Sequence, residues 1–403
     1  MQIVRASILT WEHLTVKIER HLFPIRIDAL DNSSPSHLNT DSKQVTLPNR
    51  RGFNSAAMAI SAGVLGGMAF PAVAAPDRKG SKNEKSPAEL VTPEARRAID
   101  KGLSFLKRNQ VKSGRNRGAF ANGGLSGGVA TASLGGLAMM CGGHAPGRGP
   151  YGKAIDRAVE FVMSQVQSTG YIAMGGNGSR ENMYGHGFSM LFLSQAYGMT
   201  QKAEIGKKLR DAVKLTCQCQ NDQGGWRYRP QKSDADLSIT VCQIMGLRGA
   251  RDAGIDVPDE VRSKCIDYVK KSQNVNGSFR YTMNGGHTTF AMTAAGVTSL
   301  YSAGIYEGEN VTKALDYLMR TPPNGANMGG GHYFYSHYYA VQAMWHAGGK
   351  YWDKWYPLIR EQLIRNQMTD GAWKSSEAGP PFGAAMACII LQMPLNYLPV
   401  FSP

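Results

Sequence analysis

The chain has 403 residues, enough for two or three domains of ordinary size, and carries a formal net charge of +15 at pH 7. This excess of Lys and Arg suggests anionic surroundings, such as a membrane surface, an anionic polymer of the cell envelope or an anionic substrate. Solvated faces of the outer helices are the alternative explanation. No arginine-rich block with interleaved aromatic residues accompanies the charge, so we expect no binding to nucleic acid. The six cysteines lack Cys-x-x-Cys spacing, and we expect most of them to be small buried residues.

Residues 1–75 are predicted to be an N-terminal extension that ends in an export signal. Arg50 and Arg51 precede a weakly apolar stretch at 56–70, and a run of small residues follows it. This order is typical of a twin-arginine signal with cleavage near Ala74, and it predicts export to the periplasm or cell envelope. An uncleaved membrane anchor is the alternative.

Further along, the chain repeats a motif about every fifty residues. A helix-forming run ends in Gln, and a Gly and then an aromatic residue follow it. The clearest copies join Gln220 to Trp226, Gln273 to Phe279 and Gln367 to Trp373. A period of this size indicates one supersecondary unit stacked several times, and we expect these six side chains to link successive units.

A second apolar segment follows each motif. The first segments carry charged residues on one face, such as Arg157, Glu160 and Lys208, whereas the second segments are apolar on nearly all sides. The first set is therefore expected outside and the second inside. The inner segments are expected at 129–140, 188–197, 237–247, 289–301, 333–345 and 382–391. Continuous strand alternation is absent.

These segments predict an all-α fold, an (α/α)6 toroid with a double ring of six outer and six inner helices, over residues 95–398. Neighbouring helix pairs must bury their apolar faces against one another, and closure of the ring removes the exposed ends. Residues 76–94 are expected to form a solvated linker, and residues 399–403 a C-terminal tail.

The repeat resembles one found in a known family. A basic and a small residue, an aromatic and an aliphatic residue, and then Gln follow at fixed spacing, as in Lys101, Phe105 and Gln110. This pattern is similar to the QW repeat of squalene-hopene cyclases and to the related repeat of protein prenyltransferase β subunits. The resemblance implies a terpenoid-cyclase-like toroid with a central cavity for a hydrophobic, isoprenoid ligand. It also implies a cyclase activity of the isomerase or lyase type, or a prenyl transferase activity.

The inner helices of a toroid run parallel, so their N-termini gather at one end of the ring. His287 follows two glycines near one such start, and Asp234 and Asp236 precede the inner segment that begins at Leu237. We expect Asp236 to act as an acid or ligand, Asp234 as its partner and His287 as a base or second ligand. For Asp236, capping of the helix is the alternative.

The aligned helix dipoles at this end favour an anionic group, so polar residues there are expected to hold a polar or anionic substrate end. Aromatic residues of the inner helices would line the cavity or form core. The predicted substrate-binding residues are His186, His332, Tyr333, Tyr335 and Phe290.

The run from Asp234 to Leu237 resembles the Asp-x-Asp-Asp motif with which squalene-hopene cyclases protonate their substrate, with the last Asp missing. Matched without gaps, the family's central acid becomes Ser238. The same aspartates and His287 also resemble the zinc ligands of prenyltransferase β subunits, with Asp236 in the place of Cys. The resemblance therefore implies a zinc set of Asp234, Asp236 and His287, and no other cofactor is expected.

A second class of function remains open, a non-catalytic toroidal scaffold that binds a protein or a cell-envelope polymer. A toroidal glycosidase or lyase would need two facing carboxylates. Candidate carboxylates in loops are Glu181, Asp222, Asp370 and Glu377, but no pattern in the sequence pairs them.

Overall fold

The computed structural model describes residues 87–120, 128–174, 182–321, 323 and 332–402. The chain divides into two compact units, residues 1–71 and 72–403, and all described residues belong to the second. The predicted export signal at Arg50 and Arg51, most of the predicted linker and the candidate carboxylate Glu181 lie outside the described residues. In the described part of the chain, no helix combines the length and the apolar character that a membrane span requires.

Six helices with one buried face form an outer ring. In α1, for example, Ala95, Ile99 and Leu106 recur at helical spacing on the buried side, while the Lys and Arg residues are exposed. The outer helices are α1 (Pro93–Asn109), α3 (Gly152–Ser164), α5 (Ala203–Cys219), α7 (Asp259–Lys271), α9 (Glu309–Met319) and α11 (Gly349–Arg365).

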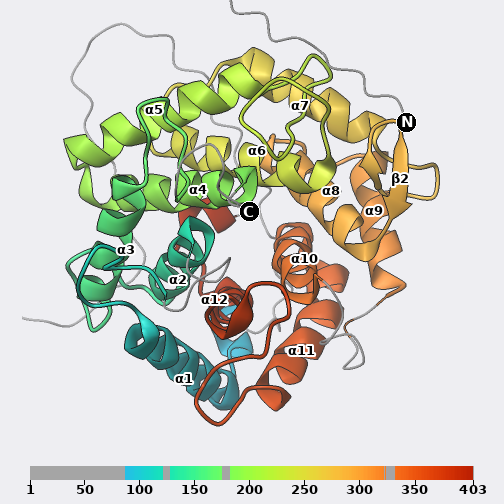
Figure 1. The fold of residues 1–403 in the computed structure, drawn as a ribbon. Coiled ribbons are helices and arrows are strands. Elements are labelled where there is room, and N and C mark those ends of the chain that lie inside the picture. Colours follow the sequence, from blue (N-terminus) through green and yellow to red (C-terminus); the bar gives the residue numbers. More distant parts are fainter. Residues whose placement is uncertain (1–86, 121–127, 175–181, 322, 324–331, 403) are drawn as a thin grey trace, which may run out of the picture. The chain divides into compact units, whose positions relative to one another are not determined.

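Six helices that are buried on nearly all sides form an inner ring. They are α2 (Val129–Cys141), α4 (Met183–Thr200), α6 (Leu237–Asp252), α8 (Phe290–Ser302), α10 (Tyr333–Ala347) and α12 (Gly379–Gln392). Each inner helix contacts the next, and α12 contacts α2, so the ring is closed (Figure 1). The predicted α/α toroid is thereby confirmed.

Glutamine side chains connect successive outer helices. Gln220 Nε2 donates to the carbonyl of Gly224 in its own turn and to the carbonyl of Val261 in the first turn of α7, at 2.9 and 2.8 Å. Gln110, Gln273 and Gln367 make the same pair of hydrogen bonds in their own repeats. The bond from Gln367 reaches Ala98 of α1 and so joins the last outer helix to the first.

The glycine of each turn lies against the backbone of the next outer helix. Gly277 has a φ of +91°, and a Cβ atom added there would lie 2.3 Å from the carbonyl oxygen of Lys313. Gly224 has the same relation to Lys264. A residue with a side chain would be strained in this conformation and would also push the helices apart. The motif therefore needs Gly because two outer helices meet at this point.

Two features depart from the predicted layout. A short antiparallel hairpin, β1 (Arg280–Thr282) and β2 (Gly285–Thr288), precedes α8, so His287 lies on a strand and not at a helix N-terminus. The chain from 399 on, predicted to be a tail, forms a 3₁₀ helix, η5 (Pro399–Phe401), that contacts α6. Phe401 is buried there, with its ring 6.3 Å from that of Tyr338 in α10.

Candidate functional site

Asp236 caps the N-terminus of α6. Its Oδ1 atom accepts a hydrogen bond from the backbone N–H of Ile239 at 2.9 Å and another from the hydroxyl of Ser238. Its Oδ2 atom lies 3.3 Å from Arg227 Nη1, and the side chain is fully buried. Both carboxylate oxygens therefore have partners in the protein, as the capping alternative predicts.

Burial raises the pKa of Asp236 above the ordinary range of Asp, and the hydrogen bonds from Ser238 and Ile239 and the charge of Arg227 act in the opposite direction. A proton added at Oδ2 would face the guanidinium of Arg227. The carboxyl group is thus poorly placed to give a proton to a ligand.

Three inner helices meet at Ser238. The hydroxyl of Tyr184, at the start of α4, donates to Ser238 Oγ. The hydroxyl of Tyr335, in the first turn of α10, donates to the Ser238 carbonyl at 2.9 Å. The rings of Tyr184 and Tyr335 are in edge contact, with their centroids 6.0 Å apart. Because α4 and α10 lie on opposite sides of the inner ring, these contacts cross it.

Deeper in the ring, aromatic side chains of α10 fill the centre. The ring of Tyr338 meets that of Phe188 of α4 at 5.8 Å, and the hydroxyl of Tyr339 lies 3.0 Å from Cys242 Sγ of α6. All four side chains are buried. At this level, side-chain contacts of α10 with α4 and α6 fill the centre of the inner ring.

Arg227 lies between two tyrosine rings at the start of the inner layer. Its guanidinium carbon is 5.0 Å from the ring centroid of Tyr228 and 5.5 Å from that of Tyr281 on β1. The hydroxyls of the two tyrosines are hydrogen-bonded to each other. Arg227 Nε also lies 3.4 Å from Asp234, whose carboxylate is largely exposed. This cluster ties the loop before α6 to the hairpin.

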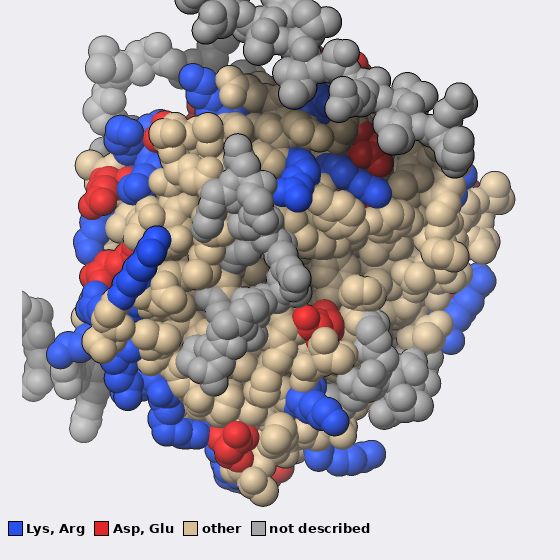
Figure 2. All heavy atoms as spheres, viewed as in Figure 1, with Lys and Arg blue, Asp and Glu red and all other residues tan. Residues whose placement is uncertain are grey.

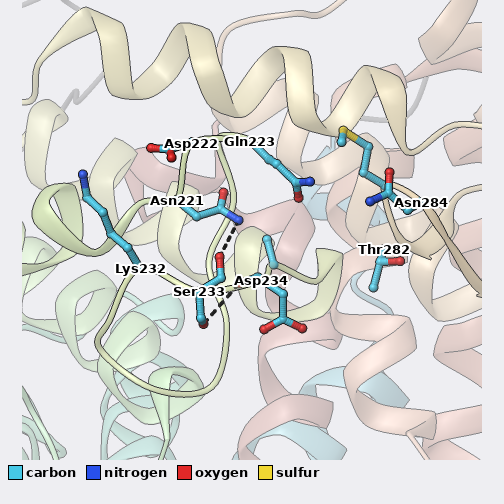
Figure 3. Close-up of a pocket in the computed structure, with 10 residues that line it drawn as sticks. Asn221, Asp222, Gln223, Lys232, Ser233, Asp234, Thr282 and Asn284 are labelled. Atoms are coloured by element: carbon cyan, nitrogen blue, oxygen red, sulfur yellow. Dashed lines mark hydrogen bonds between the residues drawn. The ribbon is translucent and has the colours of Figure 1, made fainter.

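A pocket of about 390 Å³ opens between that loop and the hairpin (Figure 3). Asn221 anchors one wall, because its amide donates to the Ser233 carbonyl at 2.9 Å and its side-chain oxygen accepts from the N–H of Gly225. Most of the lining side chains end in an amide, hydroxyl, carboxylate or ammonium group. The lining residues are Asn221, Asp222, Gln223, Lys232, Ser233, Asp234, Ala235, Thr282, Met283 and Asn284.

The residues predicted as catalytic or as metal ligands lie in different surroundings. Asp236 is buried, Asp234 lines the pocket, and His287 is exposed on β2. Among the described residues, no three His, Cys, Asp or Glu side chains are grouped so as to hold a metal ion. Asp234, Asp236 and His287 are therefore not assembled as a zinc set, because the hairpin inserts between the α7 turn and α8.

The predicted substrate-binding residues do not form one group either. His186 is fully buried in α4, where Nδ1 accepts from the N–H of Ile172 and Nε2 pairs with the hydroxyl of Thr216. Tyr335 reaches the mouth of the ring, where its ring is in edge contact with that of His332, with centroids 6.4 Å apart. Three others lie around the start of α8 and α10: His332 is exposed, Tyr333 is buried and Phe290 is half-buried against His337.

Two features of this end of the ring did not follow from the sequence. Glu377, in the loop before α12, accepts hydrogen bonds from the N–H groups of Phe334 and Tyr335, and burial raises its pKa. It caps α10, whose own N-cap residue, His332, supplies no side-chain hydrogen bond. Arg227 and Tyr228 directly follow Trp226 of the repeat motif. Their position next to the motif is the sequence feature that could have indicated a role at the mouth of the ring.

No model of a protein family matches the chain, and a search of curated proteins finds no significant match. Solved structures do resemble it. The type II terpene cyclase MstE from Scytonema is 14% identical with a TM-score of 0.52, over 76% of this chain and 100% of that one. Cellobiose 2-epimerase from Bacillus thermoamylovorans is 13% identical with a TM-score of 0.55, over 75% and 98%.

An inactive variant of the α-1,6-mannanase GH76A of Salegentibacter, in complex with α-1,6-mannotetrose, is 10% identical with a TM-score of 0.54, over 75% and 98%. At such low identity these likenesses show the fold alone. The chain is an α/α toroid, an architecture that these terpenoid and carbohydrate enzymes share.

Proposed function

We propose that this protein is an exported toroidal scaffold that binds a hydroxyl-rich carbohydrate polymer of the cell envelope. The binding site is the pocket between the loop before α6 and the β1–β2 hairpin. The observation that carries this proposal is the lining of the pocket, in which amide, hydroxyl and charged groups from two segments converge. Sugars present hydroxyl groups that such side chains bind as donors and acceptors.

The tyrosines near the pocket support a carbohydrate ligand. Tyr228 and Tyr281 are half-exposed, and Tyr281 is on the strand next to the pocket residue Thr282. Arg227 lies between these two rings, so a sugar would pack on the ring faces turned away from Arg227, and an apolar tyrosine face suits the apolar face of a sugar ring. Two of the toroids with a similar fold are named for, or bound to, carbohydrates.

Binding without catalysis fits the state of Asp236. Both of its oxygens are engaged, by the N-cap hydrogen bonds and by Arg227. Protonation of an alkene or of a glycosidic oxygen would need a carboxylic acid that points at the ligand. Ser238, at the position of the cyclases' central acid, carries a hydroxyl and cannot take this role.

A hydrophobic or isoprenoid ligand, which the repeat resemblance implies, is the competing hypothesis. It would need an apolar cavity among the inner helices. The contacts of Tyr338 with Phe188 and of Tyr339 with Cys242 count against it, because these side chains occupy the middle of the ring.

Affinity gel electrophoresis with soluble neutral polysaccharides, such as dextran, mannan and xyloglucan, tests the carbohydrate proposal. We expect at least one polymer to retard the protein. Asp222→Ala and Asn284→Ala should weaken that retardation, since both side chains line the pocket. Asp370→Ala is the matched control, because Asp370 occupies the corresponding turn after α11, outside the pocket. If no polymer retards the protein, or if Asp370→Ala has the same effect as the pocket variants, the proposal fails.

Native mass spectrometry and organic extraction of the purified protein test the isoprenoid hypothesis. A carbohydrate-binding scaffold should yield no stoichiometric lipid. Recovery of one isoprenoid molecule per chain would instead support a cyclase-like or prenyltransferase-like toroid.

Export is part of the proposal and rests on the order of residues around Arg50 and Arg51. Replacing both arginines with Lys in a reporter fusion should keep the protein in the cytoplasm. Unchanged export of the double variant would point to a general secretory signal or an anchor.

A further inference from the structure

The first repeat differs from the others by an insertion in its turn. Gln110 and Phe120 form the same isolated bridge that joins Gln273 and Phe279 in a later repeat. The first pair is ten positions apart and the second pair six, so the turn after α1 has four additional residues. This longer turn contributes Lys112, Arg115 and Arg117, all of them exposed.

Contacts bring this turn beside the start of α3. Gln110 Nε2 donates to the Ala154 carbonyl, and Lys107 Nζ donates to the Pro150 carbonyl at 3.0 Å. The exposed cations of both segments therefore share one surface, which we call the basic edge. It consists of Lys107, Arg108, Lys112, Arg115, Arg117, Arg148 and Lys153. On the face shown in Figure 2, Lys and Arg gather along the side where Figure 1 places α1 and α3.

The outer helices α1, α3, α7 and α9 can be compared position by position, because each accepts a hydrogen bond from the Gln of the preceding motif around the ring. In α7 and α9, the carbonyl that accepts this hydrogen bond belongs to Val261 or Asn310. The residue before it is a glutamate, Glu260 or Glu309. Each pairs with a lysine four positions later at 2.7 Å.

In α3 the matching residues are Lys153 and Arg157. The first outer helix, α1, shows the same change: Gln367 donates to the Ala98 carbonyl, and the matching residues are Arg97 and Lys101. Both helices beside the basic edge therefore carry a base where α7 and α9 carry a glutamate.

Few carboxylates offset the basic edge. Carboxylates beside it are Asp156 and Glu160 of α3 and Asp100 of α1, whose charge acts on Tyr151. Within the described residues, only Arg117 of this surface forms an ion pair, with Glu160. Lys112, Arg115, Arg148 and Lys153 are exposed cations, and their positive potential adds up over the surface.

From this surface we infer a second binding site, for an acidic polysaccharide that bears carboxylate groups along its chain. Arg and Lys side chains bind carboxylates through charge-assisted hydrogen bonds, and spaced cations suit a chain with spaced anions. Of the large exposed hydrophobic residues in the described chain, Tyr397 and Met368 border the basic edge. Tyr397 lies against Gly143, and Met368 lies in the turn whose Asp370 carbonyl accepts from Arg108. They are single side chains on separate segments and form no apolar helix face in the described residues. This favours a polymer over a bilayer, since peripheral membrane helices insert a continuous apolar face.

Nucleic acid is disfavoured for a related reason. Proteins that bind single strands stack bases on open aromatic rings. The ring beside this surface, Tyr151, already contacts Lys107, with Nζ 5.6 Å from its centroid, and the ring of His144, with centroids 4.8 Å apart. The site is built from elements other than the pocket, so the inference does not depend on the proposed neutral-polymer function.

Binding of the full chain to polygalacturonate, measured by calorimetry at low and high salt, tests the inference. We expect binding at roughly 0.05 M salt that weakens at least tenfold at roughly 0.3 M. Lys153→Glu is the sharpest variant, because it reverses one charge of the basic edge at an exposed position where α7 and α9 already carry a glutamate, so it should keep the fold. It should weaken binding roughly fivefold, and Lys112→Glu with Arg115→Glu by more.

Lys354→Glu, on an exposed lysine of α11, is the matched control, since it changes the net charge as much as Lys153→Glu does. It should change affinity less than about twofold. Equal losses for Lys354→Glu and Lys153→Glu would show attraction by net charge alone and overturn the site. Tighter binding to anionic phospholipid vesicles or to single-stranded DNA than to polygalacturonate would also overturn it. No binding to polygalacturonate at low salt would have the same result.

Discussion

Trp373→Ala probes the residue that closes the ring between its last and first repeats. The indole is fully buried, and its N–H donates to the Leu363 carbonyl at 2.8 Å. Its ring lies against α1, where a Cβ atom on Gly102 would be 2.8 Å from the indole. The side chain therefore connects the turn after α11 to α1, the first outer helix of the ring.

The cost of the substitution follows from burial and from one hydrogen bond. A buried Trp removes about 200 Å² from water, which at about 25 cal/mol per Å² corresponds to about 5 kcal/mol as an upper value. The unpaired Leu363 carbonyl adds about 1 kcal/mol, and partial collapse of the cavity offsets some of the loss. We expect Trp373→Ala to lower the free energy of unfolding by about 4 kcal/mol.

Urea unfolding followed by far-ultraviolet circular dichroism measures this change. Trp226→Ala should cost a similar amount, because Trp226 is as buried and donates to Thr216 with the same geometry. Trp373→Phe keeps a buried ring but removes the indole N–H and part of the ring volume, and should lose about 2 kcal/mol. Tyr397→Ala, at a residue that is 55% exposed, is the control and should change stability by less than about 0.5 kcal/mol.

The reasoning would be refuted if both Trp→Ala variants lost less than about 1 kcal/mol, since burial in the ring would then contribute little. A strand-rich spectrum of the unmodified protein would contradict the fold itself.

Three further predictions concern the turn, a buried histidine and the cysteines. Gly277→Ala should destabilise by about 2 kcal/mol or more, whereas Gly254→Ala, with a φ of +86° but no atom within 4 Å of the added Cβ, should cost about 1 kcal/mol in the same urea assay. Burial lowers the pKa of His186 to about 4, so stability should fall as pH drops from about 6.5 towards 4, by up to about 3 kcal/mol. In His186→Asn that part of the pH dependence should vanish; an unchanged profile would contradict a neutral buried imidazole. Burial raises the pKa of Cys217 to about 11, but this cysteine is only half-buried. It should therefore react with a thiol reagent before the fully buried Cys265 and Cys388. Reaction of all six cysteines at one rate in the native state would argue against the described packing.

The sequence by itself determined the architecture. Helical spacing with one charged face predicted outer helices such as α1, and segments apolar on all sides predicted inner helices such as α2, because burial patterns repeat with the helical period. The Gln, Gly and aromatic motif located the turns, since only Gly tolerates the close approach of the next helix at positions such as Gly277.

The tertiary structure alone decided what the mouth of the ring contains. Asp236 and His287 are both near inner-helix starts in the sequence, yet a hairpin places His287 on an exposed strand. The carboxylate of Asp236 is bound by the hydroxyl of Ser238 and the guanidinium of Arg227. The filling of the centre depends on how far Tyr338 and Tyr339 of α10 extend towards α4 and α6. Such distances between segments far apart in the chain depend on loop geometry and side-chain direction, which no local periodicity encodes.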